Sequence, residues 1–587
     1  MMLKKSKEIT RSLIVIILIL FSLSFSGQTI LPKIFGDYMV LQRNDSVKIW
    51  GWDSLATSVF INTSWNGSTS STVVNSNGKW SVLVSTPDTS SFSNIPTAHT
   101  VTVLGTDTLV FSNVLIGEVW LCSGQSNMQM PLQGFGASQP VENGLTIINE
   151  SILGYDNNIR YIEIPRTLSI IAQDTLGNKN KRNKWQGPTT ILNQKKFFGA
   201  IAYMFAREMY DSLNMPIGVI NCANGGTIIE SWLDTVSTSK FSYIDSSSSN
   251  YFYPDDTTSP AINTPSAVYN GMIHPIEGYG IRGMLWYQGE GNRGRPDEYQ
   301  ELLPELVSSF RQKWDKDFPF YYVQIAPHSN NRGPFWESNR KSYYSMNDTL
   351  GQIGMVISSD LGQYNSLCTD YVNHPPKKKE IAERLARWAL SENYGFIGFT
   401  KSGPMSRLAL EDNLGSAVTV YFNFVGDGLV ANPNGMNNYE IAGANEVYFP
   451  ASVVLNANNS ITLQSSSVVA PSWVRTGEGS CPDSATLHNL AGLPASAFTM
   501  EVNNTVNFFN DDDKFDFSIY PNPTEGNIKI SIENFNGNIK TEVFDLIGNM
   551  LNNSNKTTIS LEGYDRGIYI IKVSYQGQVK ELKVIKA

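Results

Sequence analysis

Between residues 114 and 395, apolar segments of strand length alternate with longer segments of helical periodicity. The strand-like segments are residues 114–122, 217–222, 283–287, 320–325 and 355–359, and the helical ones are 199–213, 298–314 and 377–390. Alternation of this kind predicts an α/β domain with a mostly parallel sheet covered by helices. Reactive groups in such domains gather beyond the carboxyl ends of the strands, so the residues after each strand are the candidates for chemistry.

Glycines and polar side chains follow four of these strands. Ser123–Met128 follows the first, Asn224–Thr227 the second and Gln288–Asn292 the third, and His374 comes after the fifth. A serine, glycine amides, side-chain amides and an imidazole, with an acid nearby, are what acyl transfer through a serine nucleophile requires.

These residues take distinct roles in such a reaction. A serine hydroxyl needs a base before it is nucleophilic, so we predict Ser126 as the nucleophile and His374 as its general base. The developing oxyanion needs preorganised donors. The candidate donors are amides from three loops: the backbone of Ser126, Gly225 or Gly226, the side chain of Asn292 and, in addition, that of Gln288.

Longer motifs surround these residues. They are Gly117–Met128, Gly225–Thr227, Gly283–Glu290 with Asn292, and His374-Pro375 with Lys378, together with the early Met39–Arg43 and the late Asn489–Pro494. Over roughly residues 31–502 the chain resembles the SGNH, or GDSL-like, hydrolases of the sialate O-acetylesterase type. The resemblance implies a flavodoxin-like core, a serine esterase mechanism and release of acetate from acetylated sugars. It assigns the nucleophile to Ser126, the base to His374 and the oxyanion contacts to Gly225, Gly226 and Asn292.

The acid of the triad departs from that family's pattern. SGNH hydrolases commonly place it three residues before the histidine, where this chain has Tyr371. Asp370 is the nearest acid and our first choice, and Asp360 at the end of a strand is the rival. A third reading is a Ser126–His374 pair whose histidine is oriented by a backbone carbonyl.

The flanking regions read as export signals and β domains. Residues 1–26, with a basic start and an apolar stretch, read as a signal peptide. Residues 27–113 predict a β-sandwich, 114–395 the catalytic domain, 396–510 an associated β-rich region and 511–587 a second sandwich after a charged linker. The last part resembles the C-terminal sorting domain of type IX secretion through Tyr520–Pro523, Gly567–Tyr569 and the final Lys583-Val584. It implies contact with that secretion machinery and a secreted or cell-surface location.

Composition narrows the remaining classes. The 587 residues carry a net charge of −9, which argues against nucleic acid as a partner. No second apolar segment is long enough to span a membrane in the mature protein. Five histidines and four widely spaced cysteines lack ligand spacing, so we expect no metal or organic cofactor. The cysteines are Cys122, Cys222, Cys368 and Cys481, and they allow three disulfide pairings or free buried thiols.

The sequence therefore predicts a multidomain protein with a central α/β SGNH hydrolase domain flanked by β-sandwich regions. Its predicted function is a secreted carbohydrate O-acetylesterase acting on an acetylated sugar or glycan. The alternatives are an esterase of acetylated xylan or other hemicellulose and a non-catalytic glycan-binding surface protein. Nothing in the sequence separates a sialic acid pocket from a xylose pocket.

Overall fold

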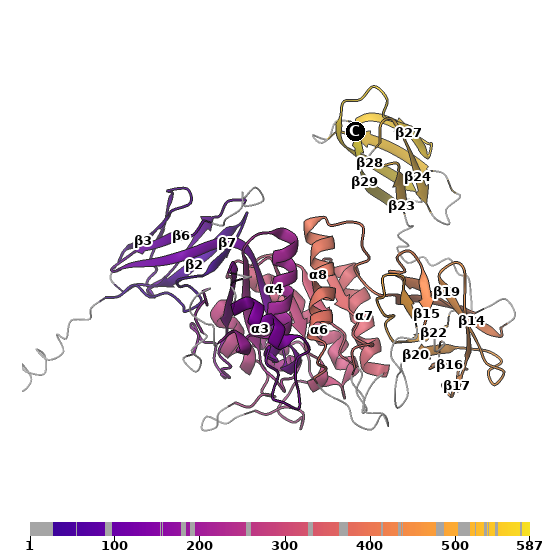
Figure 1. The fold of residues 1–587 in the computed structure, drawn as a ribbon, viewed down its shortest axis with the longest axis horizontal. Helices are drawn as coiled ribbons and strands as arrows, with labels where there is room; N and C mark the ends of the chain where they lie inside the picture. Colours follow the sequence, from indigo (N-terminus) through magenta and orange to yellow (C-terminus); the bar gives the residue numbers. More distant parts are fainter. Residues whose placement is uncertain are drawn as a thin grey trace, which may run out of the picture. The chain divides into compact units, whose positions relative to one another are not determined.

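The chain divides into two compact units, residues 1–504 and 505–587 (Figure 1). The computed structural model describes residues 27–54, 56–88, 97–152, 154, 157–177, 183–187, 194–253, 260–326, 333–362, 374–411, 415–432, 436, 438–476, 487–502, 517–522, 524–532, 537, 539–545, 550–575 and 578–586. The predicted signal peptide lies outside these residues, as do Asp370, Cys368 and Cys481. Cys122 and Cys222 are buried free thiols.

A parallel sheet forms the middle of the first unit. Its strands, in spatial order, are β8 (Ile159–Glu163), β9 (Ile217–Ala223), β7 (Thr108–Gly124), β10 (Gly283–Tyr287), β11 (Phe320–Val323) and β12 (Ile353–Val356). Every residue of β9, β10, β11 and β12 is buried, which explains why these strands read as nearly continuous apolar runs, interrupted in β9 by Asn221. The five predicted strands are confirmed, and the edge strand β8 was not predicted.

Four long helices pack on this sheet. Helix α4 (Ala200–Leu213) lies against α8 (Lys378–Tyr394), and α6 (Pro296–Trp314) lies against α7 (Gly333–Thr349) (Figure 1). The apolar stripe of α8 is buried as its periodicity predicted. The sequence analysis missed α7, because its polar and aromatic residues present no aliphatic stripe.

Strand β7 joins the amino-terminal region to the parallel sheet. Its first half pairs antiparallel with β6 (His99–Leu104). Strand β6 pairs in turn with β3 (Ser58–Thr63), and β3 pairs with β4 (Thr69–Val73). A separate antiparallel pair is formed by β2 (Ser46–Trp52) and β5 (Lys79–Ser85). The short β1 (Val40–Gln42) runs parallel to β7. The buried Glu118 of β7 accepts hydrogen bonds from Gln42 at 2.9 Å and Arg43 at 2.5 Å, so the early motif fastens this region to the central strand.

Two further β regions, residues 405–501 and the second unit, each have an apolar core of their own. Residues 405–501 form sheets around a separate apolar cluster. Their strands are β13 (Met405–Glu411), β14 (Ala417–Asn423), β15 (Leu429–Ala431), β16 (Tyr439–Ala442), β17 (Tyr448–Pro450), β18 (Ser452–Leu455), β19 (Ser460–Gln464), β20 (Trp473–Thr476), β21 (Leu487–Asn489) and β22 (Phe498–Glu501).

The second unit is wholly β in the residues described. Its strands are β23 (Phe517–Tyr520), β24 (Asn527–Ile532), β25 (Ile539–Phe544), β26 (Met550–Ser554), β27 (Thr558–Ser560), β28 (Gly567–Tyr575) and β29 (Gln578–Lys586). They form a three-stranded and a four-stranded sheet around one apolar core. In the described residues of both units, no helix has the length and apolar character needed to cross a membrane.

Candidate active site

Ser126 begins the short helix α2 (Ser126–Gln129) directly after β7. Gly124 closes the strand with φ +133°, and a Cβ there would lie 2.2 Å from the carbonyl oxygen of Tyr287. Only glycine fits so close to β10 in that conformation. The buried Gln125 then receives hydrogen bonds from the amides of Gly289 (3.4 Å) and Gly291 (3.2 Å). The turn that carries the serine is thereby fixed to the loop after β10.

Gly225 packs against the serine. A Cβ on this residue would lie 3.2 Å from Cβ of Ser126, so the loop after β9 contacts the predicted nucleophile through a residue without a side chain. The amide of Gly225 donates to Oε1 of Gln129 at 2.7 Å. Gly226 follows with φ +80°. The serine and the two glycines therefore lie together, and the Gly225 amide is engaged within the protein.

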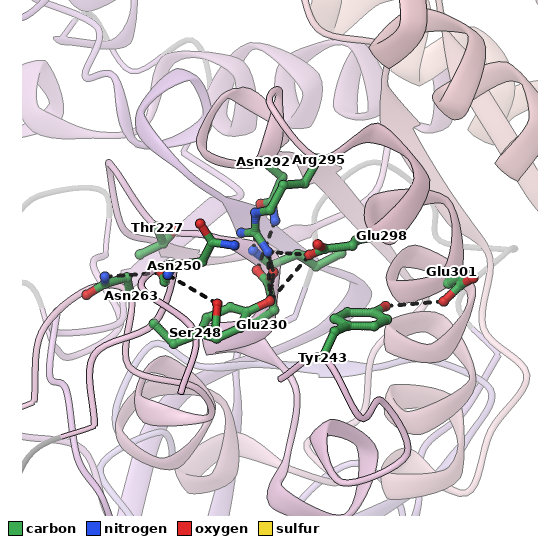
Figure 2. A network of polar contacts seen from close by, with 12 residues as sticks. Thr227, Glu230, Tyr243, Ser248, Asn250, Asn263, Asn292, Arg295, Glu298 and Glu301 are labelled. Atoms are coloured by element: carbon green, nitrogen blue, oxygen red, sulfur yellow. Dashed lines mark hydrogen bonds and ion pairs between the residues drawn. The ribbon is translucent and has the colours of Figure 1, made fainter. Parts of the chain in front are cut away.

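Asn292 and Gln288 are both buried. Figure 2 shows Asn292 in one polar network with Glu230 and Arg295. Oδ1 of Asn292 accepts from the Ile229 amide and from Nε2 of Gln288, both at 2.9 Å. Its Nδ2 donates to Glu230 at 2.9 Å, and Glu230 also pairs with Arg295. These side chains connect the loops after β9 and β10. Their predicted role as oxyanion donors stays a prediction, because in this structure both amide groups donate to protein oxygens.

His374 is held by the segment that follows α2. Its Nδ1 lies 3.0 Å from Oε1 of Gln139, and the ring of Phe135 packs edge-on at 5.0 Å between centroids. An amide oxygen only accepts, so this contact places the proton on Nδ1 and leaves the lone pair on Nε2. Sequence reasoning missed Gln139 and Phe135, which stand in an irregular segment far from the histidine in sequence.

Burial and a neighbouring cation keep this imidazole neutral. Loss of solvent lowers the pKa of His374 to about 4, and the positive charge of Lys378 lowers the pKa further in the same direction. A neutral imidazole with a free Nε2 lone pair is the form in which histidine acts as a general base.

A buried polar chain connects the serine turn to the histidine segment. Nζ of Lys378, the first residue of α8, donates to Oδ1 of Asn127 at 2.5 Å, and Nδ2 of Asn127 donates to Glu290 at 2.5 Å. Burial lowers the pKa of Lys378 to about 7, with Glu290 acting in the opposite direction, and burial raises the pKa of Glu290. Because Asn127 adjoins Ser126 and Lys378 lies four residues after His374, this chain fixes the two segments relative to each other.

The two candidate acids stand differently. Both carboxylate oxygens of Asp360 are bonded to Arg384, at 2.7 and 2.6 Å, which is a bidentate ion pair. Asp370 lies outside the described residues. Within the described chain, no group of three histidine, cysteine or acidic side chains is placed to hold a metal ion.

The fold is an open parallel α/β sheet with Ser126 at the carboxyl end of its central strand, where proteins of this class gather their reactive groups. His374 is a neutral imidazole whose Nδ1 is held by Gln139. Residues 116–390 match the family model described as carbohydrate esterase, sialic acid-specific acetylesterase. Residues 518–587 match a secretion system C-terminal sorting domain. Residues 116–390 are therefore similar to carbohydrate esterases of the sialate O-acetylesterase type, and residues 518–587 are similar to a sorting tail.

Known proteins share parts of this chain. The human sialate O-acetylesterase is 30% identical over 319 residues, which are 51% of this chain and 57% of that protein. The mouse sialate O-acetylesterase is 26% identical over 417 residues, which are 63% of this chain and 74% of the mouse protein. The chain therefore spans little more than half the length of the human relative. Among solved structures, a carbohydrate acetylesterase from Xanthomonas citri is similar with TM-score 0.66 and 27% identity, covering 81% of this chain and 99% of that one.

Proposed function

We propose that this protein is a carbohydrate O-acetylesterase that hydrolyses acetyl esters on sugars through an acyl-enzyme at Ser126. The observation that carries the proposal is the position of His374. Gln139, ten residues after the end of the helix of Ser126, holds its Nδ1, and Lys378, four residues after His374, is bonded to Asn127 next to the serine. We assign the Nε2 lone pair to the serine proton. The named activities of the human and Xanthomonas citri relatives support the same reaction class.

In the proposed mechanism, Oγ of Ser126 attacks the acetyl carbonyl while Nε2 of His374 takes its proton. The imidazolium returns the proton to the departing sugar oxygen, which leaves acetyl-Ser126. A water molecule, deprotonated by the same nitrogen, then attacks the acetyl group, and acetate is released with Ser126 restored. We assign the oxyanion to the backbone amides of Ser126 and Gly226, since the Gly225 amide already donates to Gln129.

Two groups compete for the third role. A single N–H at Nδ1 points to one acceptor, and Gln139 occupies that place in the described residues. We therefore favour a Ser126–His374 pair oriented by an amide oxygen, and Asp370 remains the alternative. The bidentate pairing of Asp360 with Arg384 argues for a structural role there.

For the substrate we propose an acetylated sugar residue of a glycan. The human and mouse relatives are named for sialate, whereas the Xanthomonas citri protein is named only for carbohydrate. An esterase of acetylated xylan or hemicellulose is thus the second candidate, and a non-catalytic glycan-binding protein the third. The sorting tail supports type IX export to the cell surface or medium.

We also propose a flavodoxin-like arrangement for residues 114–395. Support comes from the order β9-β7-β10-β11-β12, in which the second parallel strand lies before the first when β8 is set aside as an added edge. For residues 27–113 and 511–587 we propose β-sandwiches, and for 396–510 a β-rich region. Separate apolar clusters support the regions 396–510 and 511–587. Residues 27–113 share one cluster with the catalytic domain, and their antiparallel strand pairing is what distinguishes them.

The test is acetate release by the full chain from a chromogenic acetate ester, from O-acetylated sialic acid and from acetylated xylan. We expect Ser126→Ala and His374→Ala each to lose activity by about 10⁴-fold or more, and the double variant to be scarcely worse. Ser138→Ala, an exposed serine in the following segment, is the matched control. An Ser126→Ala protein that keeps its activity would refute the mechanism, and no acetate release from any of the three esters would favour the non-catalytic alternative.

A further inference from the structure

A cleft of about 400 Å³ lies far from Ser126, between the β2–β5 pair and the loops that precede β10. The catalytic-domain wall carries His274 and Glu277, which come before β10, and Lys313 at the end of α6. Ser126, in contrast, lies at the opposite end of β10, where the Gln125 amide donates to the Tyr287 carbonyl. The length of β10 alone, about 13 Å at ~3.3 Å per residue, separates the two places.

The β2–β5 wall is aromatic and cationic. Strand alternation turns Val47, Ile49 and Gly51 inward and leaves Lys48, Trp50 and Trp52 on the opposite face, where both indoles are half-buried. Trp50 pairs with Ser81 and Trp52 with Lys79 across the two strands. Half-buried indoles beside charged groups combine an apolar surface with polar groups at its edge, which is the composition of many ligand-binding clefts.

The shape of this wall is fixed before any ligand arrives. The ring of Phe35 packs edge-on against Trp50 at 4.7 Å between centroids. Gly51, between the two indoles, has no room for a side chain, because a Cβ there would lie 2.2 Å from the carbonyl oxygen of Ile30. Rigid aromatic surfaces bind at a low entropic cost, since little freedom remains to be lost.

Some polar groups of the cleft already form ion pairs or hydrogen bonds within the protein. Lys79 pairs with Asp174 at 3.2 Å, Lys313 with Asp234 at 2.7 Å, and the Tyr269 hydroxyl donates to Glu277. Nδ1 of His274 contacts the Gln173 carbonyl at 3.0 Å. The ammonium of Lys48 lies 5.8 Å from the centroid of the Trp50 ring, at the edge of the aromatic wall. Three lysines and two carboxylates therefore line the cleft, with an excess of donors beside indole faces.

We propose that this cleft binds a pyranose unit of a glycan chain, separately from the esterase site. The C–H face of a pyranose ring packs on an indole, and its hydroxyls both donate to carboxylates and accept from ammonium groups. A cleft of this volume falls in the range of small-ligand sites. Such a site holds the polymer while its acetyl groups are removed at the far edge of the sheet.

The experiment measures binding of glycans that carry no acetyl group to the full chain by isothermal titration calorimetry. The probes are xylohexaose, cellohexaose and sialyllactose. We expect at least one to bind, and Trp52→Ala to weaken that binding by about tenfold or more. Trp65→Ala, a half-buried tryptophan of the same region outside the cleft, is the matched control and should bind like the wild type. Lys48→Glu is the second variant, because Lys48 is exposed and its replacement leaves the core intact.

The activity on a small chromogenic acetate separates this proposal from the esterase itself. Trp52→Ala and Lys48→Glu should keep kcat and KM for that ester, and should raise KM for an acetylated polymer. Absence of binding for all three probes, or unchanged binding in both cleft variants, would overturn the cleft assignment even in a fully active esterase. Glycan binding that is lost in the cleft variants supports it even if no ester is hydrolysed.

Discussion

Replacing Gln139 by glutamate turns the neutral amide that contacts His374 into a carboxylate of nearly the same shape. The carboxylate oxygen would stand about where Oε1 now lies, 3.0 Å from Nδ1. Two unit charges centred about 4 Å apart interact by about 4 kcal/mol at an effective dielectric constant near 20. At 1.36 kcal/mol per pKa unit that is about three units, and solvent at this half-buried ring reduces it to about two. The pKa of His374, now about 4, should rise to about 6.

The assay is the pH profile of kcat/KM for a chromogenic acetate between pH 4 and 9. Protonated imidazole cannot accept the serine proton, so activity falls below the pKa of the histidine in the free enzyme. We expect the acid limb of Gln139→Glu to move up by about two pH units, with kcat at pH 8 retained. Gln133→Glu, an exposed glutamine in the same segment, is the control. Superimposable profiles for Gln139→Glu and wild type would refute the orientation by Gln139 and would point to Asp370.

The remaining predictions concern Lys378, Gly225, the two aspartates and metal removal. Lys378→Met should lower kcat/KM by about tenfold and move the acid limb to higher pH, because a cation that depresses the histidine pKa is removed, while the exposed Lys379→Met leaves both unchanged. Gly225→Ala should lower kcat by about 10²-fold without a large loss of thermal stability, since its methyl would contact the nucleophile at 3.2 Å. Asp360→Asn should lower the melting temperature and leave kcat nearly unchanged. Asp370→Asn should keep activity within about tenfold of the wild type, and a loss near 10⁴-fold would instead make Asp370 the triad acid. Prolonged dialysis against EDTA should leave kcat unchanged, and a loss restored by one added metal would contradict this.

The sheet was predictable because its strands are buried on both faces. Runs such as Ile217–Ala223 and Gly283–Tyr287 are almost entirely apolar, with Asn221 as the polar exception, and segments of amphipathic helical period alternate with the strands. Segments with weaker patterns were missed. The edge strand β8 is short, and α7 is polar along most of its length, so neither element has a pattern that can be recognised from a single sequence.

The site was predictable only at the level of its loops. The strand ends predicted that Ser126 and Gly225 lie near each other, because parallel strands bring their carboxyl ends to one edge, and the two residues do pack together. The role of His374 stays a prediction. Which side chain bonds which depends on tertiary contacts across long separations. Gln139 reaches His374 across 235 residues, and Lys378 reaches Asn127 across 251. No local pattern records such pairs.

The polar chain beside the serine has a consequence for how the base is tuned. Lys378 holds Asn127 while its charge acts on His374, so position and pKa depend on the same side chain. An imidazole oriented by a neutral amide, next to a buried cation, stays unprotonated even in mildly acidic surroundings. A carboxylate at Nδ1 would stabilise the imidazolium more strongly, but it would also raise the pKa of the histidine, so the base would be protonated at mildly acidic pH. For the proposed esterase, this arrangement predicts activity that persists into mildly acidic pH.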